Sequence, residues 1–311
     1  MQIQTDAPFA ATFPRIRLEG IISLLLTPFR EDKSIDWPTY DAYVEWQVSH
    51  QPAGLFAVCG SSEMHTLTLD ERLQLATRAV QRAGDVPVLA TANLESEPAK
   101  HGEELQQMVS TGVSGIVLIP RASFASDLPR YLAYFQELIG LSPVPVFLYE
   151  WPHVQPCLLD PWLVGQLAGS ISGIKDTTCT MEGIEAKIAV AGNAVIYQAN
   201  TAFLLDAFAS GARGSMAITS TCYPDLSIAL WHAFESGDEQ EAARLHRELV
   251  TLNSLLGVGY PLTAKHLVAR RGIPILPVTR TSTSLQPQHL KSLDIWNRPY
   301  ISNDTPRRVT D

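Results

Sequence analysis

The sequence predicts an α/β fold, a (β/α)8 TIM barrel with additional C-terminal helices. Short apolar runs of strand length recur along the chain, and between them lie stretches with an apolar residue at every third or fourth position. The second pattern is typical of amphipathic helices. The apolar runs are nearly continuous rather than alternating, as in parallel strands buried on both faces. Eight such strand–helix units favour a closed barrel.

Each expected strand is preceded by a Gly, a Pro or a polar turn. The strands are expected at residues 21–27, 54–60, 86–92, 115–120, 144–150, 172–177, 194–199 and 214–219. Helices are expected between them, for example at residues 39–50, 70–84 and 99–112. Further helices, with no strand between them, are expected at residues 225–238, 239–257 and 261–272.

These elements predict one domain with four parts. The parts are an N-terminal tail at residues 1–17, the barrel core at 18–222, helices that close and extend the barrel at 223–300, and a tail at 301–311. The polar, proline-containing stretch from Asn297 onward is expected to be loose. A doubly wound sheet is the alternative for a strand–helix repeat. No GxGxxG follows the first strand, which argues against a dinucleotide-binding fold.

Composition narrows the class of partner. The chain of 311 residues has a formal net charge of -9 and no run of Lys and Arg, so we expect no nucleic-acid partner. No apolar run reaches the roughly 20 residues that cross a bilayer, so no membrane insertion is expected. The N-terminus has neither a signal-peptide nor a transit-peptide pattern, which predicts a cytoplasmic protein.

Metal and disulfide chemistry are not expected either. The four cysteines (Cys59, Cys157, Cys179 and Cys222) form no CxxC pair, and the eight histidines show no ligand spacing. We therefore predict reduced cysteines and no catalytic metal.

Functional groups of a (β/α)8 barrel lie at the carboxyl ends of its strands. Lys175 ends the sixth expected strand, where burial would lower its pKa and leave a neutral amine able to attack a ketone. The alternative is structural, with Lys175 in a buried ion pair with Asp176 or Glu150. Spacing alone leaves both open.

Tyr149 ends the strand before the one that carries Lys175. The two side chains can therefore converge, with the phenol moving protons during imine chemistry. Without Lys175, Tyr149 would be interpreted as a packing residue. The turn at residues 60–63, after the second strand, offers backbone N–H groups and hydroxyls that suit a carboxylate or phosphate. Its structural interpretation is an N-cap for the next helix.

Together these strand ends resemble the dihydrodipicolinate synthase / N-acetylneuraminate lyase family of pyruvate-type class I aldolases. The resemblance runs from about Ile21 to about Gly272. The segments that carry it are the turn and helix start GSSEMHTLTLDER at residues 60–72, TPF at 27–29, YEWP at 149–152, GIKD at 173–176 and GARG at 211–214.

The resemblance implies a (β/α)8 barrel, usually a homotetramer, which forms an imine between a lysine and a 2-oxo acid such as pyruvate. It implies Lys175 as the nucleophile, Tyr149 as the proton relay, and Gly60 and Ser61 at the substrate carboxylate. It also implies that the main-chain carbonyl of Met216 faces the site, which Ala199 lines in place of a glycine. A homo-oligomer, tetramer or dimer, follows as an expectation, and the resemblance implies that neither a metal nor an organic cofactor is needed.

Several positions depart from the family pattern. Gly60 stands at a hydroxyl position of the turn and Ser62 at its glycine position. Arg121 and Ala122 follow Pro120 where dihydrodipicolinate synthases have tyrosines, one of which reaches a neighbouring subunit. Val154 replaces an arginine that binds their second substrate, and Glu150 replaces an asparagine. Dihydrodipicolinate synthesis is therefore not expected, and Arg121 is a candidate to bind an acidic or hydroxylated substrate tail.

Three functions follow from this comparison. The first is a Schiff-base lyase or aldolase acting on pyruvate or a 2-oxo (3-deoxy) acid through Lys175. The second is a 2-oxo sugar acid dehydratase that uses the same imine. The third is a non-catalytic member that binds a sugar acid, since fold alone does not settle function.

Overall fold

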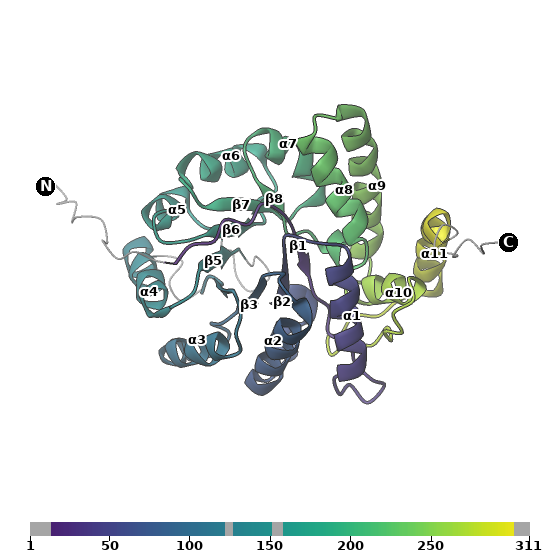
Figure 1. Cartoon of the computed structure of the whole chain (residues 1–311), viewed down its shortest axis with the longest axis horizontal. Coiled ribbons are helices and arrows are strands. Elements are labelled where there is room, and N and C mark those ends of the chain that lie inside the picture. Colours follow the sequence, from purple (N-terminus) through teal and green to yellow (C-terminus); the bar gives the residue numbers. More distant parts are fainter. Residues whose placement is uncertain (1–13, 122–126, 151–157, 302–311) are drawn as a thin grey trace, which may run out of the picture.

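The computed structural model describes residues 14–121, 127–150 and 158–301. Within them, eight parallel strands close into a barrel in the order β1 to β8, and helices surround it (Figure 1). The predicted (β/α)8 barrel with additional C-terminal helices is confirmed, and a doubly wound sheet is excluded.

All eight strands lie within the ranges that the sequence predicts, except that β1 begins one residue earlier, and each is shorter than its predicted range. They are β1 (Gly20–Leu24), β2 (Gly54–Val58), β3 (Val88–Thr91), β4 (Gly115–Leu118), β5 (Val146–Tyr149), β6 (Gly173–Asp176), β7 (Val195–Gln198) and β8 (Gly214–Ser215). Every residue of these strands is buried. Apolar side chains thus face both the barrel interior and the helices outside, as the continuous apolar runs require.

The helices of the barrel follow the strands. They are α1 (Trp37–Ser49), α2 (Leu69–Ala83), α3 (His101–Ser110), α4 (Leu128–Leu141), α5 (Pro161–Leu167), α6 (Met181–Val190), α7 (Leu204–Ala209) and α8 (Pro224–Glu235). Helix α8 packs against β1 and so completes the eighth unit. Three more helices follow: α9 (Glu239–Gly257), α10 (Leu262–Arg270) and α11 (Pro287–Ile301).

Glycine closes the barrel between its last and first strands. A Cβ atom on Gly214 would overlap the carbonyl oxygen of Gly20 and the ring of Tyr197. The absence of a side chain therefore lets β8 approach β1 closely.

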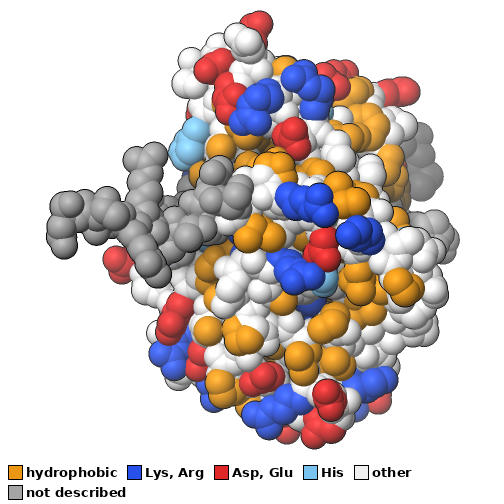
Figure 2. All heavy atoms as spheres, turned by 90° about the vertical axis from the view of Figure 1, so that its right-hand side faces the viewer, with side chains coloured by type: hydrophobic (Ala, Val, Ile, Leu, Met, Phe, Trp, Pro, Cys, Tyr) orange, Lys and Arg blue, Asp and Glu red, His pale blue; other side chains and the backbone are white. Residues whose placement is uncertain are grey.

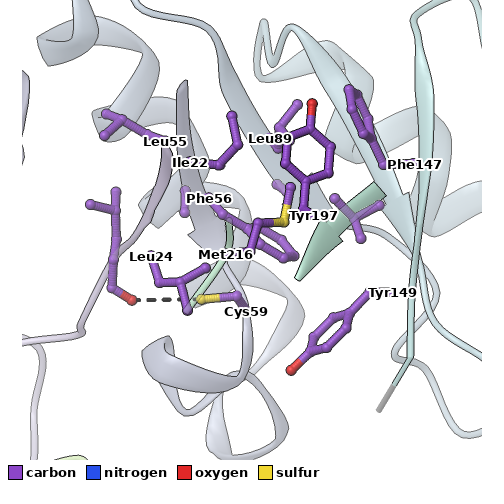
Figure 3. Close-up of a cluster of buried hydrophobic side chains, with 14 of the residues drawn as sticks. Ile22, Leu24, Leu55, Phe56, Cys59, Leu89, Phe147, Tyr149, Tyr197 and Met216 are labelled. Atoms are coloured by element: carbon purple, nitrogen blue, oxygen red, sulfur yellow. Dashed lines mark hydrogen bonds between the residues drawn. The ribbon is translucent and has the colours of Figure 1, made fainter. Parts of the chain in front are cut away.

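A tyrosine hydroxyl lies at each end of the barrel interior (Figure 3). Tyr197 fills the amino-terminal end, where its hydroxyl donates to the carbonyl oxygen of Leu18 at 2.5 Å. Figure 3 shows the hydroxyls of Tyr197 and Tyr149 pointing to opposite ends of the buried cluster, with Tyr149 on the side of Cys59. Tyr149 thus lies at the carboxyl ends of the strands, where the site of such a barrel is expected.

Helices α9, α10 and α11 lie together on one side of the barrel (Figure 1). Figure 2 looks onto this side and shows hydrophobic, basic and acidic side chains intermixed. Within the described residues, no helix is long and apolar enough to cross a membrane.

Helix α11 corrects one expectation. It includes residues 297–301, which the sequence assigns to a loose tail. The aromatic rings of Trp296 and Tyr300 pack edge-on against Tyr223 of the barrel, and Asn297, fully buried, accepts a hydrogen bond from the Tyr223 hydroxyl. Tertiary packing thus extends the helix through the polar stretch and past Pro299.

Candidate active site

Lys175 and Tyr149 lie side by side at the carboxyl ends of β6 and β5. They are direct partners in the register of these two strands. The Lys175 ammonium nitrogen lies 4.0 Å from the centroid of the Tyr149 ring and 5.9 Å from that of Phe56 on β2. Only 5% of Lys175 and 3% of Tyr149 is exposed. The convergence of these two side chains, expected from the sequence, is present in the structure.

Burial governs the protonation of both groups. It lowers the pKa of Lys175 to about 8, and the nearby Cys59 thiol opposes this shift. Burial also raises the pKa of Tyr149 well above its ordinary value, with Cys59 and Tyr260 adding to the effect. A neutral amine is therefore accessible near neutral pH beside a phenol that keeps its proton.

A second lysine takes the carboxylates that would otherwise pair with Lys175. Lys187, on α6, contacts Glu150 and lies 3.0 Å from Asp176, and all three side chains are buried. Within the described residues, no carboxylate lies within ion-pair distance of Lys175. The structural alternative for Lys175, a buried ion pair with Asp176 or Glu150, is therefore wrong.

Glu150 connects the ends of β5 and β6 from behind the site. Its carboxylate accepts hydrogen bonds from the backbone N–H groups of Leu159 and Thr177, at 2.8 and 2.9 Å. Tyr149 precedes Glu150, and Lys175 lies two positions before Thr177. Because side chains alternate along a strand, Glu150 and Asp176 point away from the interior that Tyr149 and Lys175 enter. Glu150 thus helps to hold the strand ends that carry the two candidate catalytic residues.

The turn after β2 is not an N-cap for α2. Thr68 caps that helix and forms a capping box with Glu71. Within the turn, the Ser62 hydroxyl is occupied, since it accepts from the Cys59 N–H at 2.8 Å and donates to the Cys59 carbonyl at 2.7 Å. Among the described residues, no oxygen accepts from the N–H groups of Gly60 and Ser61. The Ser61 N–H contacts the Cys59 sulfur, which is only a weak acceptor, so both N–H groups can still bind an anion.

The turn is anchored by residues that sequence reasoning missed. The carboxylate of Glu63, whose φ is 61°, accepts from the Lys265 ammonium at 2.7 Å and the Thr279 hydroxyl at 2.5 Å. The Tyr260 hydroxyl donates to the Ser61 hydroxyl oxygen at 2.5 Å. These partners lie about 200 positions later in the sequence, in the C-terminal segment; Tyr260, for example, lies 199 positions after Ser61. No local pattern in the sequence links these residues to the turn.

The remaining predicted site residues lie at the ends of β7 and β8. Met216 is 1% exposed and belongs to the buried cluster in Figure 3. Its carbonyl oxygen accepts no hydrogen bond within the described residues. Ala199 is half-buried and donates its N–H to the carbonyl of Asp176 at 2.8 Å. Pro152, Val154, Cys157 and Ala122 lie outside the described residues.

Within the parts of the chain that the structure describes, no three His, Cys, Asp or Glu side chains are grouped to hold a metal ion. The candidate site instead offers an amine, a phenol, a serine hydroxyl and two backbone N–H groups.

These features define a (β/α)8 barrel protein with a buried lysine and a buried tyrosine on adjacent strands, at the end of the barrel where such proteins carry their sites. Residues 17–294 match the Dihydrodipicolinate synthetase family, and the chain belongs to this family.

Relatives and solved structures agree with this assignment. An N-acetylneuraminate lyase of Rhizobium meliloti (strain 1021) is 30% identical over 282 residues, which cover 89% of this chain and 94% of the relative. A 4-hydroxy-tetrahydrodipicolinate synthase of Leuconostoc mesenteroides is 27% identical over 275 residues, which cover 84% of this chain and 95% of the relative. One similar solved structure is the crystal structure of YagE, an E. coli K12 prophage protein of the dihydrodipicolinic acid synthase family, in complex with pyruvate. It superimposes with a TM-score of 0.83 at 25% sequence identity, and the match covers 90% of this chain and 98% of YagE. The names of the relatives, a lyase and a synthase, support the expectation of an enzyme.

Proposed function

We propose that this protein is a Schiff-base-forming lyase or aldolase that acts on pyruvate or a related 2-oxo acid through Lys175. One observation carries the proposal. Lys175 is buried beside Tyr149 at the mouth of the barrel, and among the described residues Lys187 forms the ion pairs that would otherwise keep Lys175 charged. The relatives named as a lyase and a synthase support the same reaction class.

The first stage of the proposed reaction forms the imine. The neutral Lys175 amine attacks the C2 carbonyl of the 2-oxo acid, and the carbonyl oxygen takes up a proton to give a carbinolamine. Loss of this oxygen as water, with a second proton, leaves the protonated imine. Tyr149, whose phenol keeps its proton at neutral pH, supplies and recovers the protons.

The second stage breaks the C3–C4 bond in aldol cleavage, or the C3–H and C4–O bonds in dehydration. In aldol cleavage the C4 hydroxyl loses its proton, the C3–C4 bond breaks, and its electron pair moves into the imine to give an enamine and an aldehyde. Dehydration would begin from the same imine by loss of the C3 proton and departure of the C4 hydroxyl as water. The backbone N–H groups of Gly60 and Ser61 and the Ser61 hydroxyl are proposed to hold the substrate carboxylate, with the Met216 carbonyl facing the imine and Ala199 lining the site.

Arg121 is proposed to bind the far end of the substrate. Its guanidinium group donates to the carbonyl oxygen of Ser96 at 3.3 Å, after β3, and no carboxylate among the described residues forms an ion pair with it. Its positive charge also contributes to lowering the pKa of His65, after β2, although burial is the larger cause. Such a cation at the rim of the barrel suits an acidic or hydroxylated tail.

The test is intact-protein mass spectrometry after treatment with pyruvate and borohydride. We expect a reduced pyruvyl adduct on the wild type and none on Lys175→Ala, with peptide mapping placing the adduct on Lys175. Lys100→Ala is the control, since this lysine is exposed and pairs with Glu97. No adduct with pyruvate or any of a panel of 2-oxo acids would overturn the proposal, and ligand binding without imine would support a non-catalytic member. Size measurement by light scattering tests the expected homo-oligomer.

A further inference from the structure

Tyr260 brings the C-terminal segment to the mouth of the barrel. It lies in the connection between α9 and α10, and its hydroxyl donates to the Ser61 hydroxyl oxygen at 2.5 Å. The phenol is enclosed near Cys59, which follows β2, and Thr221, in the 3-10 turn after β8. Burial raises its pKa well above the ordinary value, so Tyr260 stays a hydrogen-bond donor across the physiological range.

The hydrogen bond determines what Ser61 can do with its own proton. A serine hydroxyl has one proton to donate, and its oxygen can accept. Because the Ser61 oxygen accepts from Tyr260, its proton points elsewhere, and no oxygen among the described residues receives it. The Ser61 hydroxyl contacts the Cys59 sulfur instead, a weak acceptor that a carboxylate can replace. Ser62 differs, since its hydroxyl is fully engaged with Cys59.

Two further donors lie on the same turn. The N–H groups of Gly60 and Ser61 have no oxygen partner among the described residues. With the Ser61 proton, they make three donors on one short turn, which together suit a carboxylate. The turn itself is fixed by the contacts of Glu63 with Lys265 and Thr279, from the same C-terminal segment that carries Tyr260.

Building on the proposed function, we propose that Tyr260 is a positioning residue for the substrate carboxylate. Its hydroxyl holds the Ser61 oxygen as an acceptor and so commits the Ser61 proton to the 2-oxo acid. The C-terminal segment is thereby part of the binding site, and Tyr260 acts through Ser61 rather than on the reacting carbon.

The test separates binding from chemistry by a double-mutant cycle. We expect Tyr260→Phe to raise the pyruvate concentration at half-saturation of borohydride trapping by about tenfold, as for the loss of one hydrogen bond of ordinary strength. The trapping rate at saturating pyruvate should stay near that of the wild type. Ser61→Ala should raise half-saturation at least as much, and adding Tyr260→Phe to it should have no further effect, because the two residues act as a unit.

Tyr300→Phe is the matched control. Like Tyr260, this tyrosine lies in the C-terminal segment and donates a side-chain hydrogen bond, in its case to the Glu248 carboxylate at 3.1 Å. It lies outside the candidate site. The pyruvate concentration at half-saturation of trapping should be the same for Tyr300→Phe as for the wild type. The same series is measured by calorimetry with lactate, a carboxylate that cannot form an imine. Denaturation curves establish that each variant is folded, and if Tyr260→Phe does not fold, Ser61→Ala and its binding of lactate carry the test.

The outcomes distinguish this inference from the proposed function. Unchanged half-saturation in Tyr260→Phe, or additive effects of the two substitutions, would overturn the role of Tyr260 while leaving Lys175 trapping intact. If the wild type traps no 2-oxo acid but binds lactate, and Tyr260→Phe weakens that binding about tenfold, the proposed reaction fails and the inference stands. If the wild type does neither, the turn is not a carboxylate site and the inference is overturned as well.

Discussion

The Lys187 ammonium nitrogen lies 3.0 Å from a carboxylate oxygen of Asp176, the residue that follows Lys175 on β6. It also contacts Glu150, so one ammonium group on α6 faces two buried carboxylates. A buried carboxylate without a partner is costly, and a second cation near the strand end would otherwise be drawn to it. By occupying both carboxylates, Lys187 leaves Lys175 with the apolar surroundings that favour its neutral form.

The first prediction concerns this cluster. Lys187→Met is expected to lower the free energy of unfolding by about 3–5 kcal/mol at pH 8, because it leaves Glu150 and Asp176 buried without a cation. Burial already raises the pKa of Glu150. Without Lys187 the folded carboxylates bind protons more tightly than the unfolded ones, so stability falls as pH rises above the unfolded pKa. The loss should therefore be smaller at pH 5 than at pH 8.

Denaturant titration at the two pH values measures this loss. Lys187→Met combined with Glu150→Gln should recover part of the lost stability, since one of the two charges is removed. Equal losses at both pH values would show that lost packing, rather than the unpaired carboxylates, dominates.

The second prediction concerns the pH dependence of imine formation. Because the pKa of Lys175 is lowered to about 8, the neutral fraction rises about tenfold per pH unit below that value and levels off above it. The initial rate of adduct formation at low pyruvate should follow this curve between pH 6 and 9.5. Stopped trapping assays with cyanoborohydride give the rates, and a rate that keeps rising to pH 9.5 would place the pKa of Lys175 near its ordinary value.

The third prediction concerns Tyr149. Tyr149→Phe should keep the fold and the approach of the ring to the Lys175 nitrogen, now 4.0 Å from its centroid, but remove the proton donor. We expect the rate of imine formation at saturating pyruvate to fall about 10²–10³-fold, in the range typical of general acid–base catalysis. Half-saturation should change little. An unchanged maximal rate would assign proton transfer to another group or to water.

Much of the fold and the central pair could be predicted from the sequence because their signals are local. Nearly continuous apolar runs located all eight strands, and the ends of two of them presented Tyr149 and Lys175. Lys187 could not be singled out, because a lysine on a short helix is ordinarily a surface residue, and only the fold places it behind β5 and β6.

The contacts that support the turn depend on the tertiary fold even more strongly. Tyr260 and Lys265 meet Ser61 and Glu63 across 199 and 202 positions of the sequence. Contacts between residues so far apart in the sequence cannot be predicted from local sequence patterns. The same limit explains why residues 297–301 are helical, since their packing partner, Tyr223, lies far back at the start of α8.

The last prediction is that the candidate nucleophile lowers the stability of the fold. Lys175 is buried, and burial lowers its pKa to about 8, whereas an unfolded lysine titrates near 10.5. Below pH 8 the protonated amine is held in the folded state against its desolvation cost. Between about 8 and 10.5 the unfolded chain binds more protons, so the stability of the wild type rises with pH.

Lys175→Met removes the charge and keeps a side chain of similar length. It should therefore raise the free energy of unfolding at pH 7 by about 1–3 kcal/mol, less than the full linkage value because substitution also changes packing. This advantage should shrink as pH approaches 10. Denaturant curves of both proteins at pH 7 and 10 measure it, with Lys100→Met as the exposed control. A Lys175→Met protein that is less stable than the wild type at pH 7 would mean that the lysine contributes more through packing than it costs through burial of its charge.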